Sequence, residues 1–385
     1  MFKEVSIKSI IPVGLQGVYD LSVDECHQFV ANGILHHNSA EPNAQQIPKT
    51  SVDPNIKLQL KAPKGTLYIA SDFSQAELRI MAHLSGDETY LNAFNSGQDP
   101  HLAIAATKYH IPYEEALKIY EDENHPEHKI WKVRRKQAKQ IAFGLIYGIG
   151  AKLLAVKLSD PKSGIIVTPE EAQKEMDIFF GQHPKLKTFL KKQEKFLRKN
   201  GHLVSLFGRK RRLPQIYSND KGEEAYALRL ALNFPCQSAA SDMCLFGSIL
   251  IYYLMRQGKL PSTKSVCLVH DANYQITKPE NINIWSIYEM WQIYRNPLTK
   301  PYFGFQIDDV TMDMDFVIGR SMAEELPFIP GYDYRKMLEP DFSVEEYMEE
   351  HKKYKHIPIS EYKKRFNKQM KQYEKDFERT HGMEG

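Results

Sequence analysis

Basic and aromatic residues recur at every fourth position in the middle of the sequence, at Arg135, Lys139, Phe143 and Tyr147. Residues spaced by four share one face of an α-helix, so two cations and two aromatic rings should lie on a common surface. Such a surface suits a nucleoside triphosphate, with the phosphates at the cations and the sugar and base at the rings. An amphipathic helix with long cationic side chains along an apolar face would show the same spacing, and periodicity alone does not separate the two.

Two aspartates end apolar segments that read as strands. Asp72 follows the segment TLYIAS, and Asp271 follows CLVH. Adjacent strands would hold the two carboxylates side by side, and such a pair can bind two Mg²⁺ ions about 3.5–4 Å apart for phosphoryl transfer. A single aspartate at a strand end is more often a turn residue or a helix cap. Two of them, together with a cationic helix, indicate a nucleotidyl-transfer site.

A third reactive group lies near the N-terminus. The side-chain amide of Asn38 could attack its own backbone carbonyl and break the chain, with His37 or His27 as the general acid. Ser39 is a hydroxyl nucleophile that could receive an acyl group. A small β-hairpin with surface histidines would show the same residues, and spacing alone favours that interpretation.

The elements that must position these residues follow from hydrophobic periodicity and from Pro and Gly punctuation. The segments with strand-like patterns are residues 1–38, 65–73, 266–277 and 311–319. Helical spacing dominates residues 74–85, most of 88–228, 223–256 around Pro235, and the charged C-terminal segment from 343 onward. This mixture predicts an α+β fold in which a helical insertion interrupts an antiparallel sheet.

Composition excludes several classes of protein. The 385-residue chain has room for two or three domains, and its 42% hydrophobic and 26% charged residues are typical of a folded globular protein. No run of about 18 apolar residues occurs, so we expect no membrane span. The four cysteines have neither metal-ligand spacing nor the density of a disulfide framework. Eleven Lys or Arg residues and one acid lie between Lys185 and Arg212, a run that suits either phosphate contact or simple solubility.

Residues 16–39 resemble the two C-terminal sequence blocks of inteins. The matching residues are Val18-Tyr19-Asp20-Leu21, Val23, His27, Phe29, Asn32-Gly33, His37-Asn38 and the following Ser39. The resemblance implies that Asn38 cyclises with help from His37 and His27. It further implies that Asp20 supports acyl transfer and that Ser39 is the downstream nucleophile. Because only 38 residues precede the junction, we expect the N-terminal intein segment on a separate chain, as in a split intein.

Residues 39–325 resemble the family A DNA polymerases, which include bacterial DNA polymerase I and phage replicative relatives. Five blocks occur in the order found in that family: EPNAQQIP, DFSQAELR, RRKQAKQIAFGLIYG, RLALNFPCQSAASD and LVHDA. DFSQAELR is similar to the family's motif A, the RRKQ segment to its motif B and LVHDA to its motif C. The resemblance therefore implies a polymerase palm with helical fingers.

The same resemblance implies roles for individual residues. Asp72 and Asp271, with the backbone carbonyl of Phe73, would bind two Mg²⁺ ions, which Mn²⁺ could replace. The dNTP would be bound by Gln75, Glu77, Arg135, Lys139, Phe143 and Tyr147. Primer or template DNA would be contacted by Arg229, Asn233, Gln237 and His270. Within the dNTP site, Glu77 would exclude the 2′-hydroxyl, Phe143 would pack on the sugar and Tyr147 would stack at the nascent base pair.

The sequence departs from the family pattern at several positions. Ala272 replaces the Glu of motif C, and compensation by Asp313 or Asp315 on a later strand is the less favoured alternative. Phe73 replaces the usual Tyr, which matters little if only its backbone binds metal. The family's Arg before the EPN block is absent, so we expect the partner chain to supply it together with the thumb.

The sequence thus predicts the C-terminal half of a family A polymerase, joined by trans-splicing to an N-terminal half on another chain. We expect an intein segment (1–38), palm (39–87 and 226–325), fingers (88–225) and a charged helical tail of unknown role (326–385). The expected partners are the N-terminal chain, primer–template DNA and dNTP, without a membrane, in the cytoplasm of a bacterial or phage-infected cell. The alternative is a catalytically weakened DNA-binding fragment, because Ala272 cannot bind a metal.

Changes at the splice junction should separate its two steps. Asn38→Ala should block release of the C-terminal product, since no other side chain there can form the succinimide. Ser39→Ala should stop ligation but leave some cleavage after Asn38. Mass spectrometry of the chain incubated with its partner measures both, and ligated polymerase from either variant would contradict the mechanism.

Overall fold

The computed structural model describes residues 54–382, apart from 160–165, 270, 297–298 and 355–356, and the backbone of two short N-terminal strands. These strands, β1 (Gln28–Ala31) and β2 (Ile34–His37), pair antiparallel with Gln28 opposite His37. The short strands expected in this segment are confirmed at these positions. Asp20, His27, Asn38, Ser39 and His270 lie outside the described residues.

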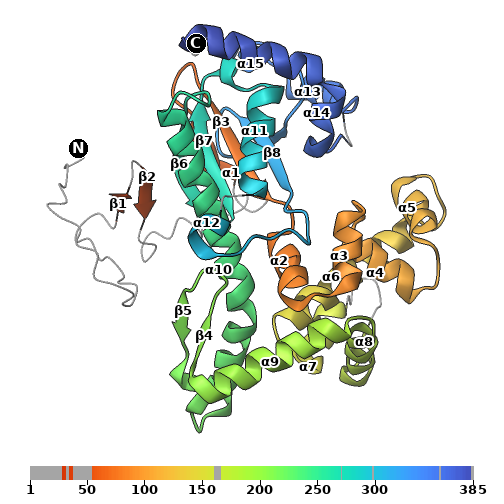
Figure 1. Ribbon diagram of the computed structural model, residues 1–385. Helices are drawn as coiled ribbons and strands as arrows, with labels where there is room; N and C mark the ends of the chain where they lie inside the picture. Colours follow the sequence, from red (N-terminus) through yellow and green to blue (C-terminus); the bar gives the residue numbers. More distant parts are fainter. Residues whose placement is uncertain are drawn as a thin grey trace, which may run out of the picture.

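A five-stranded antiparallel sheet forms one end of the described structure (Figure 1). Its order is β6-β7-β3-β8-β9, and its strands are β3 (Leu67–Phe73), β6 (Thr263–Val269), β7 (Ala272–Thr277), β8 (Met314–Gly319) and β9 (Leu326–Pro327). The strands predicted around Asp72 and Asp271 and over 311–319 are thus confirmed. Since β7 and β8 pair with opposite edges of β3, the earliest strand of this sheet lies at its centre.

The two faces of the sheet have different surroundings. Alternate side chains of a strand point to opposite faces. Asn273 on β7 is buried and bonds to helix α10 through Ser248 and to helix α11 through Tyr294. Its neighbour Ala272 therefore faces away from these helices, as does Asp72, which is opposite Ala272 in register. The helix-covered face forms part of the main core, and the other face is more open to solvent.

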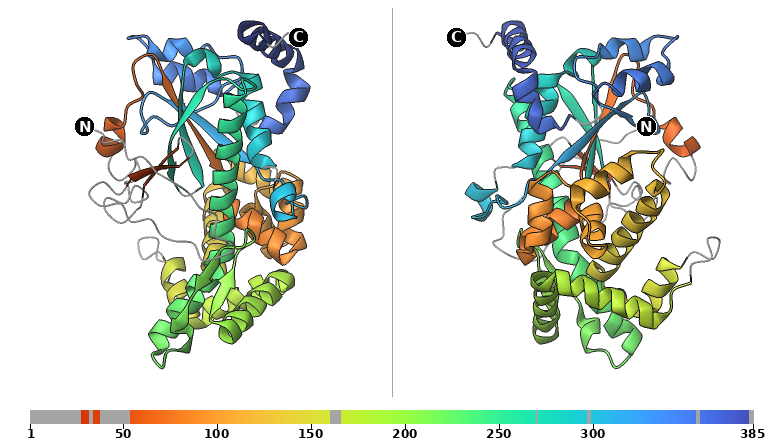
Figure 2. Two further views of the ribbon diagram at one scale, coloured as in Figure 1. Left: turned by 60° about the vertical axis from the view of Figure 1, so that its left-hand side comes forward. Right: turned by 90° about the vertical axis from the view of Figure 1, so that its right-hand side faces the viewer.

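Between β3 and α10 the chain forms a helical region that lies beside and below the sheet in Figures 1 and 2. After α1 (Pro54–Gln59), the helices are α2 (Ala76–Ser85), α3 (Glu88–Asn95), α4 (Pro100–Lys108), α5 (Tyr113–Glu121), α6 (His128–Ile146), α7 (Ala151–Leu158), α8 (Pro169–Gln182) and α9 (Pro184–Asn200). Asp87, Asp99 and Thr168 accept backbone N–H bonds at helix starts, and Pro169 and Pro184 begin two helices. These two prolines thus mark helix boundaries within the region of helical spacing.

A small second core lies at the far end of the helical region. The hairpin β4 (His202–Val204) and β5 (Lys210–Arg212) is followed by a 3₁₀ turn, η3 (Pro214–Tyr217). Leu197 on α9, Leu203 on β4 and Ala231 on α10 are buried together there. This cluster fixes the basic hairpin to the first part of α10.

Helix α10 (Lys221–Arg256) runs from this second core to the sheet. It continues through Pro235, although proline removes one backbone hydrogen bond from the helix. Gly247 lets it approach α11 (Ile284–Arg295), because an added Cβ would come within 2.7 Å of Cε1 of Tyr294. Among the described helices, α10 alone is long and apolar enough to span a membrane, a test that buried core helices also pass.

The C-terminal tail folds back onto the sheet end (Figure 2). After η4 (Pro279–Asn281) and α12 (Lys300–Phe303), it comprises η5 (Tyr334–Leu338), α13 (Val344–His351), η6 (Ile359–Glu361), α14 (Tyr362–Arg365) and α15 (Asn367–His381). The ring of Phe377 lies 5.1 Å from that of Trp285 on α11, and the Tyr347 hydroxyl donates to the Pro327 carbonyl at 2.7 Å. The predicted helical character of the tail is confirmed.

The close approach of α10 and α11 predicts a stability effect. Gly247→Ala should lower the free energy of unfolding by about 1–3 kcal/mol, because the new methyl group would overlap the Tyr294 ring. Chemical denaturation monitored by circular dichroism measures the change. Gly181→Ala in α8 is the matched control: its Cβ meets nothing within 4 Å, so this change should be neutral or slightly stabilising. Equal stability of the two variants would contradict this packing.

Candidate active site

The centre of the sheet brings acidic residues together. Asp72 on β3 is directly opposite Ala272 on β7 and Asp315 on β8. Asp271 immediately precedes β7, and its side chain forms a hydrogen bond with that of Asp72. The predicted juxtaposition of Asp72 and Asp271 is therefore present in the structure.

The surroundings of the Asp72 carboxyl disfavour its negatively charged form. Its side chain reaches solvent, yet its pKa is raised to about 7. Partial burial is the largest cause, and the charges of Asp271 and Asp315, the Asp271 hydrogen bond and the charge of Glu325 add to it. Carboxylates that repel one another in this way form a suitable donor set for a divalent cation. Within the described residues, no three His, Cys, Asp or Glu side chains are already arranged as a complete metal site.

Glu77 connects these carboxylates to two helices. It lies in the first turn of α2, and its carboxylate forms a hydrogen bond with Gln237 on α10. Burial and the charge of Asp271 raise the Glu77 pKa, while the Gln237 bond opposes the shift. The structure therefore brings together Glu77, Gln237 and Asp271, three residues predicted for the site from separate sequence blocks.

Two further predicted residues have buried acceptor atoms without partners. Gln75 caps α2 in a left-handed conformation (φ 57°, ψ 40°), and its Oε1 has no hydrogen bond among the described residues. Asn233 Oδ1 on α10 is in the same situation. A buried acceptor without a partner is costly, so each of these oxygens fits a donor supplied by a ligand.

The four-residue repeat in α6 forms one continuous surface. Arg135 donates to Asp99 at 2.6 Å, and the Lys139 amino group lies 5.7 Å from the centre of the Phe143 ring. Phe143 in turn lies 5.9 Å from Tyr147, the residue that ends the helix. The prediction that these four residues share a face is confirmed.

His101 also belongs to this surface, although no sequence pattern points to it. It is 1% exposed, its ring lies 5.7 Å from that of Phe143, and neither ring nitrogen has a partner among the described residues. Burial lowers the His101 pKa to about 4; the Asp99 charge opposes this shift, and Arg135 and Lys139 add to it. A histidine after an Asp-Pro helix start carries no sequence signal that distinguishes it from an ordinary core residue.

A family model describes this combination of residues. The model of DNA polymerase family A matches residues 28–283, which is more than half of the chain. This chain belongs to DNA polymerase family A. The match begins within residues 16–39, which resemble intein blocks, and it includes Asp72, Asp271 and the α6 surface.

Individual relatives agree with this assignment. The DNA polymerase I of Caldicellulosiruptor bescii is 33% identical over 234 residues, which are 60% of this chain and 25% of that protein. The thermostable DNA polymerase I of Thermus aquaticus is 32% identical over 216 residues, which are 56% of this chain and 23% of that protein. The chain thus spans about a quarter of the length of these relatives.

A solved structure has a similar fold. The polymerase domain of Pol1 from M. smegmatis, in complex with primer–template DNA and dNTP, matches with a TM-score of 0.59 and 28% identity. The match covers 74% of this chain and 45% of the other. The mixed helical and antiparallel-sheet fold is therefore that of a polymerase domain.

A network of polar side chains supports the acidic centre from the face of the sheet that α10 and α11 cover. The Tyr294 hydroxyl on α11 lies 2.6 Å from Asn273 Nδ2 and 3.2 Å from Ser248 Oγ. The Tyr294 ring meets Phe73 edge-on, with ring centres 6.0 Å apart. This network holds the residues on either side of Asp72, and Tyr294 carried no signal in the sequence.

Other predicted DNA contacts occupy α10 and the basic hairpin. Arg229 packs beside Gly148, which follows α6, so α10 and the end of α6 are neighbours. Arg209 in the β4–β5 turn is paired with Asp242 on α10 at 2.6 Å. Part of the basic run is thus neutralised within the protein, whereas Arg211 lies against the Phe234 ring at 5.8 Å.

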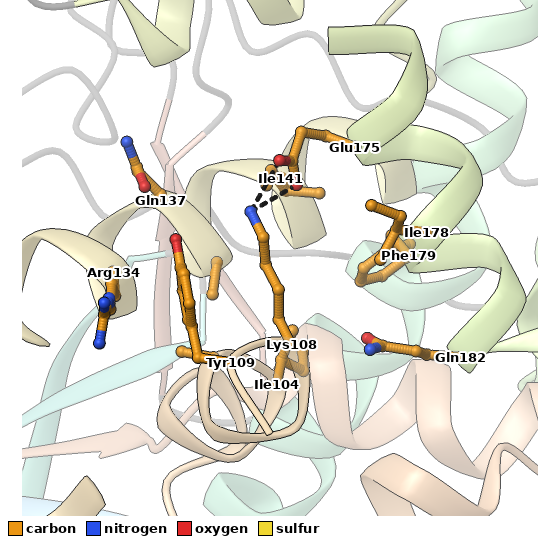
Figure 3. Close-up of a pocket in the computed structure, with 12 residues that line it drawn as sticks. Ile104, Lys108, Tyr109, Arg134, Gln137, Ile141, Glu175, Ile178, Phe179 and Gln182 are labelled. Atoms are coloured by element: carbon orange, nitrogen blue, oxygen red, sulfur yellow. Dashed lines mark hydrogen bonds and ion pairs between the residues drawn. The ribbon is translucent and has the colours of Figure 1, made fainter. Parts of the chain in front are cut away.

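The opposite face of α6 borders a cavity that is too small for a nucleotide (Figure 3). Its volume is about 20 Å³, comparable to the space of one water molecule. Lys108 on α4 extends across it to Glu175 on α8, with 2.7 Å to each carboxylate oxygen. This ion pair joins α4 to α8 and leaves the other face of α6 as the candidate nucleotide surface.

The buried His101 predicts a pH-dependent stability difference. Its pKa is about 4 in the folded chain and near 6.5 when unfolded, so the unfolded state binds more protons between these values. His101 therefore destabilises the fold increasingly as pH falls from 6.5 to 4. His101→Phe should remove this loss, and any fixed packing cost of the larger ring is the same at every pH. Between pH 8 and 4.5, the difference in melting temperature between His101→Phe and wild type should be constant near neutral pH and should change in favour of the variant as the pH falls below about 6.5. Parallel curves would contradict the assignment.

Proposed function

We propose that this chain is the C-terminal half of a DNA-directed DNA polymerase that transfers a nucleotide from dNTP to a primer 3′-OH. The observation that carries the proposal is the side-chain hydrogen bond between Asp72 and Asp271 within a family A match. The Pol1 domain from M. smegmatis binds primer–template DNA and dNTP, and we extend these ligands to this chain. Palm segments at 39–87 and 226–325, with fingers at 88–225, remain the proposed division of the polymerase region.

The acidic centre has the donors that a two-metal site needs. Asp72 and Asp271, with the backbone carbonyl of Phe73, would hold two Mg²⁺ ions, which Mn²⁺ could replace. Bound there, the ions would supply Lewis-acid stabilisation of negative charge on the primer oxygen and the triphosphate. Burial is the largest cause of the raised Asp72 pKa, and repulsion from Asp271 and Asp315 adds to it. This repulsion supports the role, because a cation between the carboxylates would relieve it.

The α6 surface provides the other half of the site. Arg135 and Lys139 would bind the triphosphate, and Asp99 holds the Arg135 guanidinium in place before the ligand arrives. We add His101 to this set, since its unpartnered ring nitrogens lie beside these cations and a phosphate oxygen would pair one of them. Phe143 would pack on the sugar, and Tyr147 would stack at the nascent base pair.

The remaining polar residues would select the sugar and contact DNA. Glu77, fixed by Gln237, would occupy the space that a ribose 2′-hydroxyl needs. The unpaired acceptors of Gln75 and Asn233 would receive donors from the minor-groove side of the primer–template. Arg229, Gln237 and His270 complete the proposed DNA contacts.

We also propose that residues 1–38 are the C-terminal segment of a split intein. The proposal rests on the residue match at 16–39 and on the short β1–β2 pair, which joins Gln28 to His37 in register. Asn38 would cyclise with His37 and His27 assisting, Asp20 would support acyl transfer, and Ser39 would be the acceptor. The partner chain would supply the rest of the polymerase, in the cytoplasm of a bacterial or phage-infected cell.

Ala272 supports a second candidate function. It lies opposite Asp72 at the position where the family pattern has Glu, so the chain would be a weakened polymerase that chiefly binds DNA. Primer extension separates the two candidates. A polymerase requires template-directed incorporation that is lost in Asp72→Asn, whereas a DNA-binding fragment would retain duplex affinity without incorporation.

Sugar selectivity tests the proposed nucleotide pocket in the spliced enzyme. Phe143 has no hydroxyl that could replace a missing 3′-OH, so wild type should discriminate against dideoxynucleotides. Phe143→Tyr should relax that discrimination, by up to about 10⁴-fold if the site is built around the hydrogen bond. Glu77→Ala should separately admit ribonucleotides.

Single-nucleotide incorporation of dNTP, ddNTP and rNTP by wild type and both variants measures these effects. Each variant is the control for the other, because Phe143→Tyr should leave ribonucleotide exclusion intact. Unchanged selectivity in an active Phe143→Tyr enzyme would mean that α6 does not bind the sugar.

A further inference from the structure

The two strands that flank β3 place different kinds of residue opposite Asp72. On β7 the residue directly opposite is Ala272, which has no polar group, and on β8 it is Asp315. Directly opposite residues of antiparallel strands place their side chains on the same face, with Cβ atoms about 4.5–5.5 Å apart. Asp315 therefore points to the same open face as Asp72 and stands on the side away from Ala272.

The Asp315 carboxylate is available at that position. It is exposed, and within the described part of the chain it makes no hydrogen bond or ion pair. It nevertheless lies beside Asp72, because the two residues are directly opposite each other in the β3–β8 register. Asp313, two residues earlier, differs, because its carboxylate accepts a hydrogen bond from Trp291 Nε1 at 2.9 Å.

A structural role for Asp315 is the competing explanation. Burial and the charge of Asp313 raise the pKa of Asp315, and the charge of the buried Arg79 on α2 opposes that rise. The Arg79 donors, however, go to the Ser74 carbonyl at 2.7 Å and to the Thr311 carbonyl, and its guanidinium lies 4.4 Å from the Phe94 ring centre. The printed hydrogen bonds of Arg79 thus go to backbone carbonyls and not to Asp315, whose carboxylate remains exposed at the open face.

We propose that Asp315 is the third acidic group of the divalent-cation site, placed on β8 in compensation for the missing carboxylate at Ala272. The inference rests on the proposed function, since it assumes that Asp72 and Asp271 hold the ions. Asp315 is a positioning residue: its negative charge adds to the attraction for a cation at Asp72 and can accept hydrogen bonds from metal-bound water. The site would then have three acidic groups, Asp72, Asp271 and Asp315, with the third supplied by β8 instead of β7.

Mn²⁺ affinity of the full chain, measured by electron paramagnetic resonance without nucleotide, tests this role. Asp315→Asn should weaken Mn²⁺ binding on the order of tenfold, which corresponds to about 1.4 kcal/mol. Asp313→Asn is the matched control, because it removes a charge from the same segment while its remaining oxygen can still accept from Trp291; its affinity should equal that of wild type. Adding Ala272→Glu to Asp315→Asn should restore the affinity, because it supplies a carboxylate on the other side of Asp72.

Thermal unfolding gives a second measurement that separates the two roles. If Asp315 serves the cation, Asp315→Asn should leave the metal-free melting temperature unchanged or raised, because repulsion at Asp72 falls, and should reduce the rise produced by Mn²⁺. If it serves Arg79, the metal-free melting temperature should drop and the Mn²⁺-induced rise should be unchanged. The second pattern would overturn the inference.

Wild-type and Asp72→Asn chains distinguish failure of the inference from failure of the proposed function. Mn²⁺ binding that depends on Asp72 but is equal in wild type and Asp315→Asn would reject Asp315 alone. Mn²⁺ binding that does not depend on Asp72 would reject the metal site itself, and the inference with it.

Discussion

The pairing of β3 with strands on both of its edges is the constraint on which the rest of the site depends. It places one carboxylate-bearing residue between two neighbours that come from positions about 200 and 240 residues later in the chain. No local interaction could hold three such distant side chains in contact. Bringing the acids together costs electrostatic free energy. Packing and hydrogen bonds on the buried face of the sheet offset this cost; there the Tyr294 hydroxyl joins α10, α11 and β7. The helices are therefore not only a scaffold, because they stabilise a sheet centre whose own charges oppose it.

Much of this arrangement could be predicted from sequence, because the residues that do chemistry also leave a periodic or positional pattern. The strand ends at Asp72 and Asp271 and the common face of Arg135, Lys139 and Phe143 are of this kind. Helix α10 was predicted through Pro235 because its apolar spacing continues on both sides of the proline. In each case a local rule of geometry determines the outcome.

What the sequence did not reveal depends on register and on contacts between distant elements. Asp315 and Asp313 are equivalent in the strand pattern, and only the pairing of β8 with β3 shows that Asp315 faces Asp72 while Asp313 bonds to Trp291. His101 and Tyr294 belong to the same category, since an ordinary core histidine or tyrosine would give the same periodicity. The role of a buried polar residue depends on whether a distant part of the fold supplies its hydrogen-bond partner.

The single helix α10 has a mechanical consequence. The first third of α10 contributes residues to the small core beside the β4–β5 hairpin. In its last third, Gly247 packs so closely on Tyr294 of α11 that there is no space for a Cβ atom. The hairpin and the sheet thus contact the two ends of one continuous helix, so that a displacement of either end can be transmitted to the other along α10. The end of α6 is tied to the same helix, because Gly148, which has a left-handed conformation, leaves no space for a Cβ atom beside Leu232 of α10.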